Sequence, residues 1–436
     1  MAVAWQTNSH KRRPARKTGP GEPLNICLLT YRGNPTCGGQ GVYIKRISRS
    51  LRDLGHNVDV VSGPPYPILD DDITLHKLPS LDLYNPDDLF RVPSLGELAS
   101  PVNMYEWLSV SSGGFPEPIS FSMRAYRFFR NNGVKYDVVH DNQCLAPGLL
   151  GIPSLGIPLV ATIHHPITVD RDVEVQSETK WWRKLKVYRW YSFVPAQVWS
   201  SRQIPYIITV SEASKTDISK AFKISPERFR VTENGINTEI FHPEPGIKRR
   251  DNQIMVTNSA DTPLKGLKYL LEAFASIRKK RDVKLVVIGK PKANGVIDRL
   301  TRDLGLNGSV TFTGRIEDNE FARYYGESTM AVVPSIYEGF GLPAGEAMAC
   351  GVPVISTTGG ALPEVVGDAG ILVPPGNALA LEEAITDLLD NPEKRNTLGK
   401  AGYKRVLKHF TWHNTAMKIV DVYREAIDAH GRFQQA

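Results

Sequence analysis

The amino-acid sequence predicts an α/β protein with two doubly wound parallel sheets. Short apolar runs typical of buried strands recur along the chain, and segments with helical spacing of apolar residues separate them. Strands that alternate with helices in this way form parallel sheets. The length of 436 residues is sufficient for two domains of ordinary size, and contents of 41% apolar and 23% charged residues are typical of a globular protein.

Composition also restricts where the protein can be located and which partners it can bind. No window approaches 18 apolar residues and the N-terminus lacks the apolar core of a signal peptide, so we expect a cytoplasmic protein without a transmembrane helix. Four scattered cysteines without a CxxC pair favour a reducing compartment over a zinc site. Five charges of the net +7 lie in residues 1–21, which contain no acid. We expect this tail to be disordered. Contact of the tail with anionic lipid or nucleic acid is left open, but a solvated tail is favoured. No nucleic-acid partner is predicted.

The first strand is predicted at Asn25–Tyr31. A loop containing Gly38 and Gly39 follows, and apolar residues from Val42 to Leu54 then recur at helical spacing. Residues 58–62 form the next predicted strand. This is a Rossmann-type beginning, but its glycines do not fit GxGxxG, so they do not predict a dinucleotide site.

Residues 63–118 are rich in proline, and we predict an irregular segment that lines a ligand site or packs as an insertion. The acidic run Asp70-Asp71-Asp72 lies in this segment. Such a run can bind a metal ion, but it follows a proline-rich loop rather than a clear strand. We therefore interpret it as a solvated turn.

Two further predicted strands end in polar residues. Val138–His140 is followed by an aspartate and an asparagine, and Pro158–Ile163 is followed by His164 and His165. A histidine just past a parallel strand lies at the edge of the sheet where ligands bind, although a lone histidine more often has a structural role.

A helix that combines tryptophan, tyrosine and basic residues is predicted at Thr179–Arg202. A helix of this composition can lie in a membrane interface. It can equally pack on its own domain with lysine and arginine side chains extending outward. The sequence leaves both interpretations open.

The second half repeats the alternation of strands and helices. Ser211 is predicted to cap a helix that ends at Phe222. The remaining predicted strands are Tyr206–Val210, Phe229–Thr232, Ile254–Thr257, Lys284–Ile288, Val310–Thr313, Met330–Val333 and Val354–Ser356, and the remaining predicted helices include Leu267–Lys279 and Trp412–Phe433.

Residues 335–354 are the most informative stretch of the sequence. A glycine turn at Gly339–Gly341 joins the strand Met330–Val333 to a helix over Leu342–Ala349. This unit places free backbone N–H groups and the positive end of a helix at the carboxyl edge of a parallel sheet, where anionic ligands bind. Two acids, Glu338 and Glu346, flank the turn eight positions apart. Carboxylates accept hydrogen bonds from the hydroxyls of a ribose or a sugar ring, although either acid alone could be a solvated residue.

Together, these residues resemble the signature of the family-4 retaining glycosyltransferases of the GT-B fold, an E-x7-E within EGFGLPxxEAMACGxPV. The resemblance covers Pro23 to Phe433 and implies two Rossmann-like doubly wound domains facing across a cleft. Residues 22–240, completed by 412–436, would form the acceptor-side domain. Residues 241–411 would form the nucleotide-sugar-binding domain.

The resemblance also implies roles for individual residues. Glu338 would contact the donor sugar, Glu346 the ribose of the nucleotide, and His164 of Thr162-Ile163-His164 would be the active-site histidine. Lys265 would hold the pyrophosphate. The implied catalytic residues are thus His164, Lys265 and Glu338, and the donor-binding residues are Gly38, Gly39, Ser259, Lys265, Arg315, Gly339, Phe340, Gly341, Leu342 and Glu346.

One position departs from the family pattern. The family has an arginine five or six residues before the lysine, where this chain has Ser259 or Ala260. A serine donates a hydrogen bond but brings no charge. Arg32 and Arg315 are candidates to replace the missing charge.

We therefore predict a hexosyl- or related glycosyltransferase that moves a sugar from a UDP- or GDP-sugar to an acceptor hydroxyl with retention, a stereochemistry implied by the family. No metal and no cofactor are expected, because a helix dipole, backbone N–H groups and Lys265 can stabilise the leaving diphosphate. A lipid-linked or glycan acceptor, and contact with an anionic membrane at its inner face, are left open. A nucleotide-sugar epimerase and a non-catalytic nucleotide-sugar-binding protein are the alternative classes.

Overall fold

The computed structural model describes residues 21–34, 39–85, 88, 91–132, 135–257 and 262–435. Residues 1–20 of the predicted tail, Gly38 and Ser259 lie outside the described residues.

The chain divides into two compact units. The amino-terminal unit comprises Met1–Thr209, Asp217–Arg230 and Ala416–Ala436, and the carboxyl-terminal unit comprises Val210–Thr216 and Val231–Thr415. The boundary therefore precedes the predicted one at residue 240. The physical reason is the burial of Ile236 in the core of the carboxyl-terminal unit, where its amide donates a hydrogen bond of 2.7 Å to the Phe410 carbonyl.

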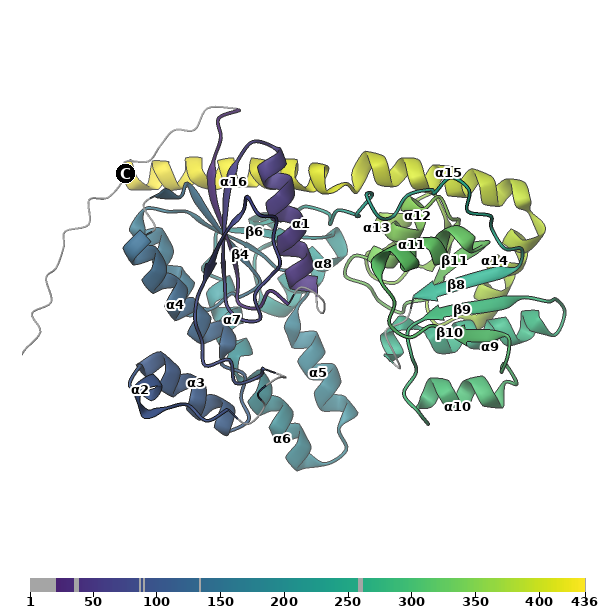
Figure 1. Ribbon diagram of the computed structural model, residues 1–436, viewed down its shortest axis with the longest axis horizontal. Coiled ribbons are helices and arrows are strands. Elements are labelled where there is room, and N and C mark those ends of the chain that lie inside the picture. Colours follow the sequence, from purple (N-terminus) through teal and green to yellow (C-terminus); the bar gives the residue numbers. More distant parts are fainter. Residues whose placement is uncertain are drawn as a thin grey trace, which may run out of the picture. The chain divides into compact units, whose positions relative to one another are not determined.

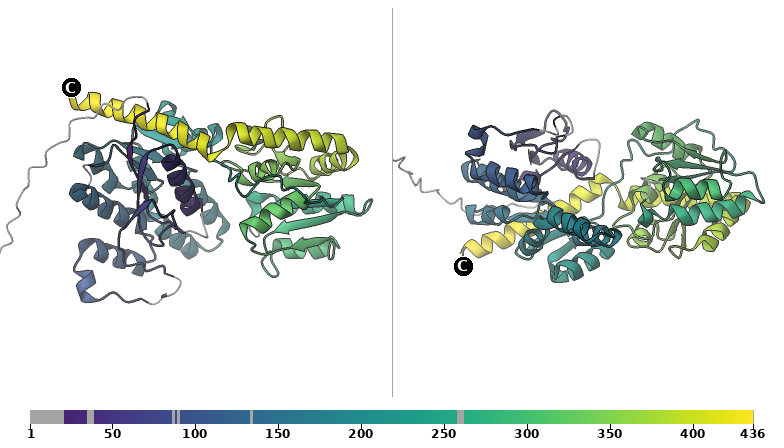
Figure 2. Two further views of the ribbon diagram at one scale, coloured as in Figure 1. Left: turned by 45° about the horizontal axis from the view of Figure 1, so that its top comes forward. Right: turned by 90° about the horizontal axis from the view of Figure 1, so that it is seen from below.

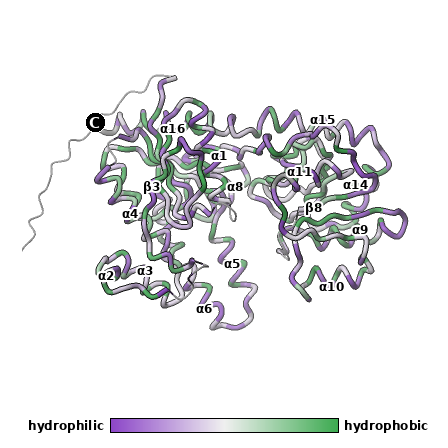
Figure 3. The backbone as a smooth tube through the Cα atoms, viewed as in Figure 1, coloured by the Kyte–Doolittle hydropathy of each residue, from purple (hydrophilic) through white to green (hydrophobic). Residues whose placement is uncertain are grey.

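The amino-terminal unit is built on a seven-stranded sheet with the order β3-β2-β1-β4-β5-β6-β7 (Figure 1). The strands are β1 (Asn25–Thr30), β2 (Asn57–Ser62), β3 (Thr74–Lys77), β4 (Val138–Asn142), β5 (Leu159–Thr162), β6 (Tyr206–Thr209) and β7 (Phe229–Val231). The pairings from β3 to β6 are parallel, as the sequence predicts. Their buried side chains form the core of this unit, and the apolar residues follow the strands in Figure 3.

Helices of the amino-terminal unit follow the strands. They are α1 (Gly39–Asp53), α2 (Leu95–Leu98), α3 (Pro101–Ser111), α4 (Glu117–Asn132), η2 (Pro147–Leu155), α5 (Ile167–Ser177), α6 (Trp181–Trp190), η3 (Tyr191–Phe193), α7 (Val194–Ser201) and η4 (Pro226–Arg228). Two helices, α8 (Glu212–Phe222) and α16 (Trp412–Gln435), begin in the carboxyl-terminal unit and end in the amino-terminal unit. Ser211 caps α8 as predicted, because its hydroxyl accepts a hydrogen bond of 3.0 Å from the Ser214 amide.

Two predictions for the amino-terminal unit are wrong. Residues 63–118 are not irregular throughout, because they contain β3, α2 and α3. β3 escaped prediction because this edge strand has no fully buried side chain and so shows no apolar run. The single helix predicted over Thr179–Arg202 is divided into α6, η3 and α7. Pro195, which cannot donate a backbone hydrogen bond, lies in the first turn of α7, where a helix start tolerates it.

The carboxyl-terminal unit has a six-stranded parallel sheet with the order β10-β9-β8-β11-β12-β13. The strands are β8 (Gln253–Thr257), β9 (Lys284–Ile288), β10 (Val310–Phe312), β11 (Met330–Val333), β12 (Val354–Thr357) and β13 (Ile371–Val373). The helices are η5 (Pro263–Lys265), α9 (Leu267–Arg278), α10 (Val296–Asp303), α11 (Asp318–Glu327), α12 (Leu342–Ala349), α13 (Leu362–Val366), α14 (Ala378–Asp390) and α15 (Pro392–His409).

Alternating side chains bury both faces of this second sheet. Met255 and Val333 belong to one apolar core, whereas Ile254 and Val332 belong to another. Helices cover both faces, as Figure 2 shows for the unit by itself. The prediction of two doubly wound parallel sheets is thereby confirmed.

Candidate functional site

In both sheets the strand order reverses beside the first strand of the unit. The reversal lies between β8 and β11 in the carboxyl-terminal unit and between β1 and β4 in the amino-terminal unit. Open parallel sheets bind ligands in the crevice outside the carboxyl ends of the strands at such a switch point. The loops that leave these four strands are therefore the first place to look for a site.

Two of the predicted catalytic residues meet at the switch point of the carboxyl-terminal unit. Lys265 ends η5 in the connection after β8, and Glu338 lies in the loop after β11. The Lys265 Nζ atom is 2.7 Å from Glu338 Oε1, and the side chains are 30% and 13% exposed. The pair places a cation and a carboxylate side by side. The Lys265 ammonium can pair with an anionic ligand, and the Glu338 carboxylate can accept hydrogen bonds from ligand hydroxyls.

Residues that sequence reasoning missed hold Glu338 in place. The Ser335 hydroxyl donates a hydrogen bond of 2.8 Å to Glu338 Oε1, and the Thr357 hydroxyl donates one of 2.5 Å to the Ser335 carbonyl. Gly360 lets the loop after β12 approach closely, because a Cβ atom there would lie 2.2 Å from the Glu338 carbonyl oxygen. The signal in the sequence was the Gly359-Gly360 pair after a predicted strand.

The glycine turn before α12 has the geometry that its sequence predicts. Gly341 is the N-cap of α12 with φ of 105°, and a Cβ atom there would also lie 2.7 Å from Leu362 Cδ2. The hydroxyls of Ser211 and Ser214 donate hydrogen bonds of 2.7 and 2.9 Å to the Gly339 carbonyl. This carbonyl is therefore occupied. At the start of α12, Pro343 has no N–H and the amides of Ala344 and Gly345 donate to the Gly341 carbonyl at 3.0 and 3.3 Å, which leaves the Leu342 amide for an anion.

The other predicted donor-binding residues have different surroundings. The Phe340 ring is buried against Phe410, with ring centroids 5.8 Å apart, so only the backbone of Phe340 is left to face a donor. Leu342 is 40% exposed. Glu346 lies half-buried on α12. The pKa of the buried Tyr325 phenol is raised mainly by burial, and the charge of Glu346 adds to this rise.

Arg315 lies on the connection after β10, next to the connection after β9, because Gly314 pairs with Gly289 in an isolated bridge. Arg315 follows β10, the edge strand, which lies two strands from β8. Neighbouring strands are about 4.8 Å apart, so Arg315 begins about 10 Å from the strand that precedes Lys265. A second cation that sequence reasoning missed, Lys290, is exposed after β9, directly beside β8.

In the amino-terminal unit, His164 follows β5 at the carboxyl edge of the sheet. Its Nε2 atom is 2.8 Å from Asn142 Oδ1, and its amide donates a hydrogen bond of 2.8 Å to the Gln143 side chain. Desolvation, and then the neighbouring His165, lower the pKa of His164 to about 3. His164 is therefore neutral at pH 7, and a proton on Nε2 leaves Nδ1 as an acceptor for a ligand hydroxyl.

A buried chain of polar side chains from β4, β5 and α16 lies next to this histidine. His140 Nδ1 lies 2.6 Å from the Tyr423 hydroxyl of α16, and His140 Nε2 lies 2.6 Å from Thr162 Oγ1. The Tyr43 ring meets the His164 ring edge-on at 4.7 Å. Desolvation lowers the pKa of His140 to about 3, so the chain is uncharged at pH 7. Sequence reasoning missed it because Tyr423 lies 283 residues away from His140.

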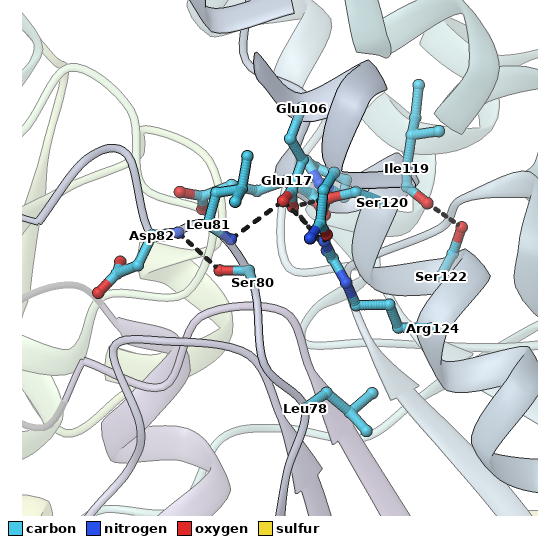
Figure 4. A network of polar contacts seen from close by, with 12 residues as sticks. Leu78, Ser80, Leu81, Asp82, Glu106, Glu117, Ile119, Ser120, Ser122 and Arg124 are labelled. Atoms are coloured by element: carbon cyan, nitrogen blue, oxygen red, sulfur yellow. Dashed lines mark hydrogen bonds and ion pairs between the residues drawn. The ribbon is translucent and has the colours of Figure 1, made fainter. Parts of the chain in front are cut away.

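A second polar network joins α3, α4 and the loop after β3 (Figure 4). Arg124 contacts both oxygens of the buried Glu106 at 2.6 and 2.7 Å, and the Ser120 hydroxyl donates to the same carboxylate at 2.5 Å. Among the described residues, buried Glu117 Oε2 accepts no hydrogen bond, and Arg32 Nη1 lies 3.4 Å from it. Burial raises the pKa of Glu117 to about 8.

The remaining predicted residues of this unit are placed as follows. Gly39 is exposed at the first residue of α1, and His165 pairs with Asp170 at 2.8 Å on the surface. Arg32 Nη1 lies 3.4 Å from Glu117 Oε2, and the Arg32 guanidinium lies 5.9 Å from the centroid of the Phe115 ring. In the run predicted as a solvated turn, Asp70 pairs with Arg49 and Arg52 of α1, at 3.5 and 3.3 Å, and Asp72 also pairs with Arg52.

Two general features of the described part of the chain complete the picture. There, no group of three or more His, Cys, Asp or Glu side chains is arranged to hold a metal ion. In the same residues, no helix is both long and apolar enough to cross a membrane.

Comparison with known families gives two matches that together cover most of the chain. A family model described as Glycosyltransferase Family 4 matches residues 37–240, and one described as Glycosyl transferases group 1 matches residues 237–405. The two matches meet close to the boundary between the two units.

Individual relatives agree with these family matches. An MMP alpha-(1->4)-mannosyltransferase from Mycolicibacterium hassiacum is 46% identical over 93% of this chain and 98% of its own length. A D-inositol 3-phosphate glycosyltransferase from Thermobispora bispora is 28% identical over 92% of each chain. Among solved structures, a sucrose-phosphate synthase from Thermosynechococcus elongatus superposes with a TM-score of 0.67 at 24% identity, covering 93% of this chain and 100% of that one, which shows a shared fold.

Proposed function

The chain belongs to glycosyltransferase family 4, and from this premise we propose that it transfers a hexosyl residue, specifically mannose, from a UDP- or GDP-sugar to an acceptor hydroxyl with retention. The name of the 46% identical relative supports mannose as the sugar. The retaining stereochemistry comes from the family resemblance.

The observation that carries the proposal is the Lys265–Glu338 pair at 2.7 Å at the switch point between β8 and β11. A nucleotide sugar offers two groups that fit this pair. Its diphosphate takes the Lys265 ammonium as a counter-charge, and its sugar hydroxyls donate to the Glu338 carboxylate. The diphosphate also lies within the field of the α12 N-terminus, where the helix dipole and the Leu342 amide favour an anion.

The remaining residues have roles in binding rather than in bond making. Glu346 accepts hydrogen bonds from the ribose hydroxyls, and neutral His164 exchanges a hydrogen bond with a sugar hydroxyl without adding charge. The charge that develops on the diphosphate as the sugar leaves is met by Lys265 and the positive end of α12, so the proposal includes no metal ion.

The acceptor is a glycan hydroxyl in this proposal, and a lipid-linked acceptor at an anionic membrane surface is the second candidate. The second candidate is favoured by Trp181, which is 73% exposed on α6 among basic side chains. Tryptophan and lysine on an exposed helix are typical of a membrane interface.

A donor screen tests the proposal. Purified protein is incubated with UDP- and GDP-linked hexoses and a mixture of manno-oligosaccharide acceptors, and release of the nucleoside diphosphate is measured. Proton NMR of the product then shows the configuration at the new anomeric carbon, for which the α-anomer from an α-linked donor is expected. Conversion of a donor without acceptor would instead indicate an epimerase. Donor binding without nucleoside diphosphate release for every donor and acceptor would contradict glycosyl transfer.

A further inference from the structure

The loop that follows β4 has an unusual backbone. Gln143 and Leu145 adopt the left-handed conformation, with φ of 57° and 53°. Residues other than glycine rarely take this conformation, because it brings the Cβ atom too close to the backbone, and such strain collects at functional sites. The loop also leaves the sheet beside the switch point between β1 and β4, where ligands bind. Its conformation and its place therefore indicate a functional role.

Side chains of the protein hold this loop in place. Asp141 is fully buried, and its side-chain oxygens accept hydrogen bonds of 3.2 Å from the Cys144 amide and 2.7 Å from the Leu145 amide. Gln197 of α7 donates a hydrogen bond of 2.9 Å to the Cys144 carbonyl. The strained backbone is thus fixed before any ligand binds, and Asn142, next to Asp141, has a defined position.

Asn142, at the end of β4, has one side-chain hydrogen bond and one unsatisfied group. Its Oδ1 atom lies 2.8 Å from His164 Nε2, and its buried Nδ2 atom has no hydrogen-bond partner among the described residues. Because a buried N–H group without a partner costs free energy, a leucine of similar size would suit this position better. The contact with His164, rather than stability, therefore explains the asparagine.

An amide as the partner of His164 determines the state of the imidazole ring. The Asn142 oxygen only accepts, so the proton of the neutral ring lies on Nε2 and Nδ1 is left as an acceptor. A carboxylate at the same position would instead stabilise a positively charged ring. Tyr43, which burial keeps neutral by raising its pKa to about 12, meets the ring edge-on at 4.7 Å, and the neighbouring His140 and His165 disfavour a positive charge on it.

We infer that Asn142 is a positioning residue that holds the proton of His164 on Nε2, so that Nδ1 is the atom that accepts a hydrogen bond from a ligand hydroxyl. The identity of that ligand, a sugar, rests on the proposed function. The state of the ring rests on the contacts of Asn142 and His164 alone.

Two substitutions of Asn142 separate this role from a structural one. Asn142→Leu removes the acceptor together with the unsatisfied Nδ2 group, and Asn142→Asp replaces the acceptor with a carboxylate. NMR of the full-length protein with 15N-labelled histidine shows which ring nitrogen carries the proton, and the His164 signals are assigned by their loss in His164→Ala. We expect the wild-type ring to stay neutral with its proton on Nε2 from about pH 5 to 8, because burial lowers its pKa to about 3. Asn142→Asp should raise the pKa of His164 by about 1–3 pH units, and Asn142→Leu should allow the proton to move to Nδ1 as well.

Gln197→Leu is the matched control. Gln197 is 2% exposed and also has one side-chain hydrogen bond and an unsatisfied atom, Oε1, but its hydrogen bond reaches the Cys144 carbonyl rather than His164. This variant should leave the proton position and the titration of His164 unchanged. A structural role of Asn142 would make the two leucine variants alike.

Turnover gives a second, independent readout. Asn142→Leu should lower turnover about 10- to 100-fold, because the ring is no longer held in one arrangement, while its midpoint of urea unfolding stays at or above that of the wild type. In a His164→Ala background the same substitution should cause no further loss, because Asn142 acts through the histidine.

Two results would overturn the inference: His164 signals that neither Asn142 variant changes, or an equal loss of turnover from Asn142→Leu with and without His164. The NMR measurement needs no turnover. A wild-type protein that releases no nucleoside diphosphate would therefore contradict the proposed function, while the state of the His164 ring would still be decided by NMR.

Discussion

Replacing Lys265 with alanine is the sharpest test of the proposed donor site. The family resemblance implies an arginine beside this lysine, whereas here Ser259 or Ala260 stands at the arginine position. The nearest cation after the neighbouring strand β9 is Lys290, and Arg315 follows the edge strand. Lys265 is therefore expected to carry most of the charge that the diphosphate meets.

The geometry separates the effect on stability from the effect on turnover. Lys265 is 30% exposed, so its 2.7 Å pairing with Glu338 is screened by solvent and contributes only about 0–1 kcal/mol to folding. Loss of one stabilising group in a transition state costs about 2–4 kcal/mol, which corresponds to a fall in turnover of about 30- to 1000-fold. Lys265→Ala should thus fold almost as stably as the wild type and turn over far more slowly.

Steady-state release of nucleoside diphosphate and urea unfolding measure the two effects. Lys268→Ala is a matched control, because Lys268 lies three residues further on, is 55% exposed and reaches Glu272 only at 3.9 Å. Ser259→Arg in the Lys265→Ala background should recover part of the lost turnover by restoring a cation. A Lys265→Ala enzyme with turnover within about threefold of wild type would refute the reasoning, because another group would then hold the diphosphate.

Three further predictions concern single residues. Glu346→Ala should weaken the binding of nucleoside diphosphate by about 1.5–3 kcal/mol in calorimetry, and unchanged affinity would remove its ribose role. Gly341→Ala should lower the free energy of unfolding in urea by more than about 1 kcal/mol, because alanine is strained at φ of 105° and meets Leu362, whereas Gly96→Ala within α2 should not; equal effects would contradict this. Burial keeps Glu117 protonated up to its pKa of about 8, although Arg32 opposes this and Glu106 and Asp82 reinforce it. Wild-type stability should therefore fall relative to Glu117→Gln by up to about 1.4 kcal/mol per pH unit from pH 5 to 8 and then level off, and parallel pH profiles would refute the raised pKa.

The sequence by itself determined the architecture and the glycine turn that joins β11 to α12. Apolar runs such as Lys284–Ile288 and Met330–Val333 are strands with the bounds that were predicted, because a strand buried on both faces needs an uninterrupted apolar run. The helix Leu342–Ala349 was predicted to the residue, since Gly341 and Pro343 define its start locally. Predictions that depend on neighbours in the chain were the reliable ones.

Only the tertiary structure decided which side chains meet. The 2.7 Å contact of Lys265 with Glu338 spans 73 residues, and the contact of His140 with Tyr423 spans 283. Phe340 lies within the donor signature, yet its ring is buried against Phe410, a residue that no local pattern connects to it. Such contacts depend on how the strands are ordered and how the helices pack on them, and the spacing of residues along the chain does not encode that directly.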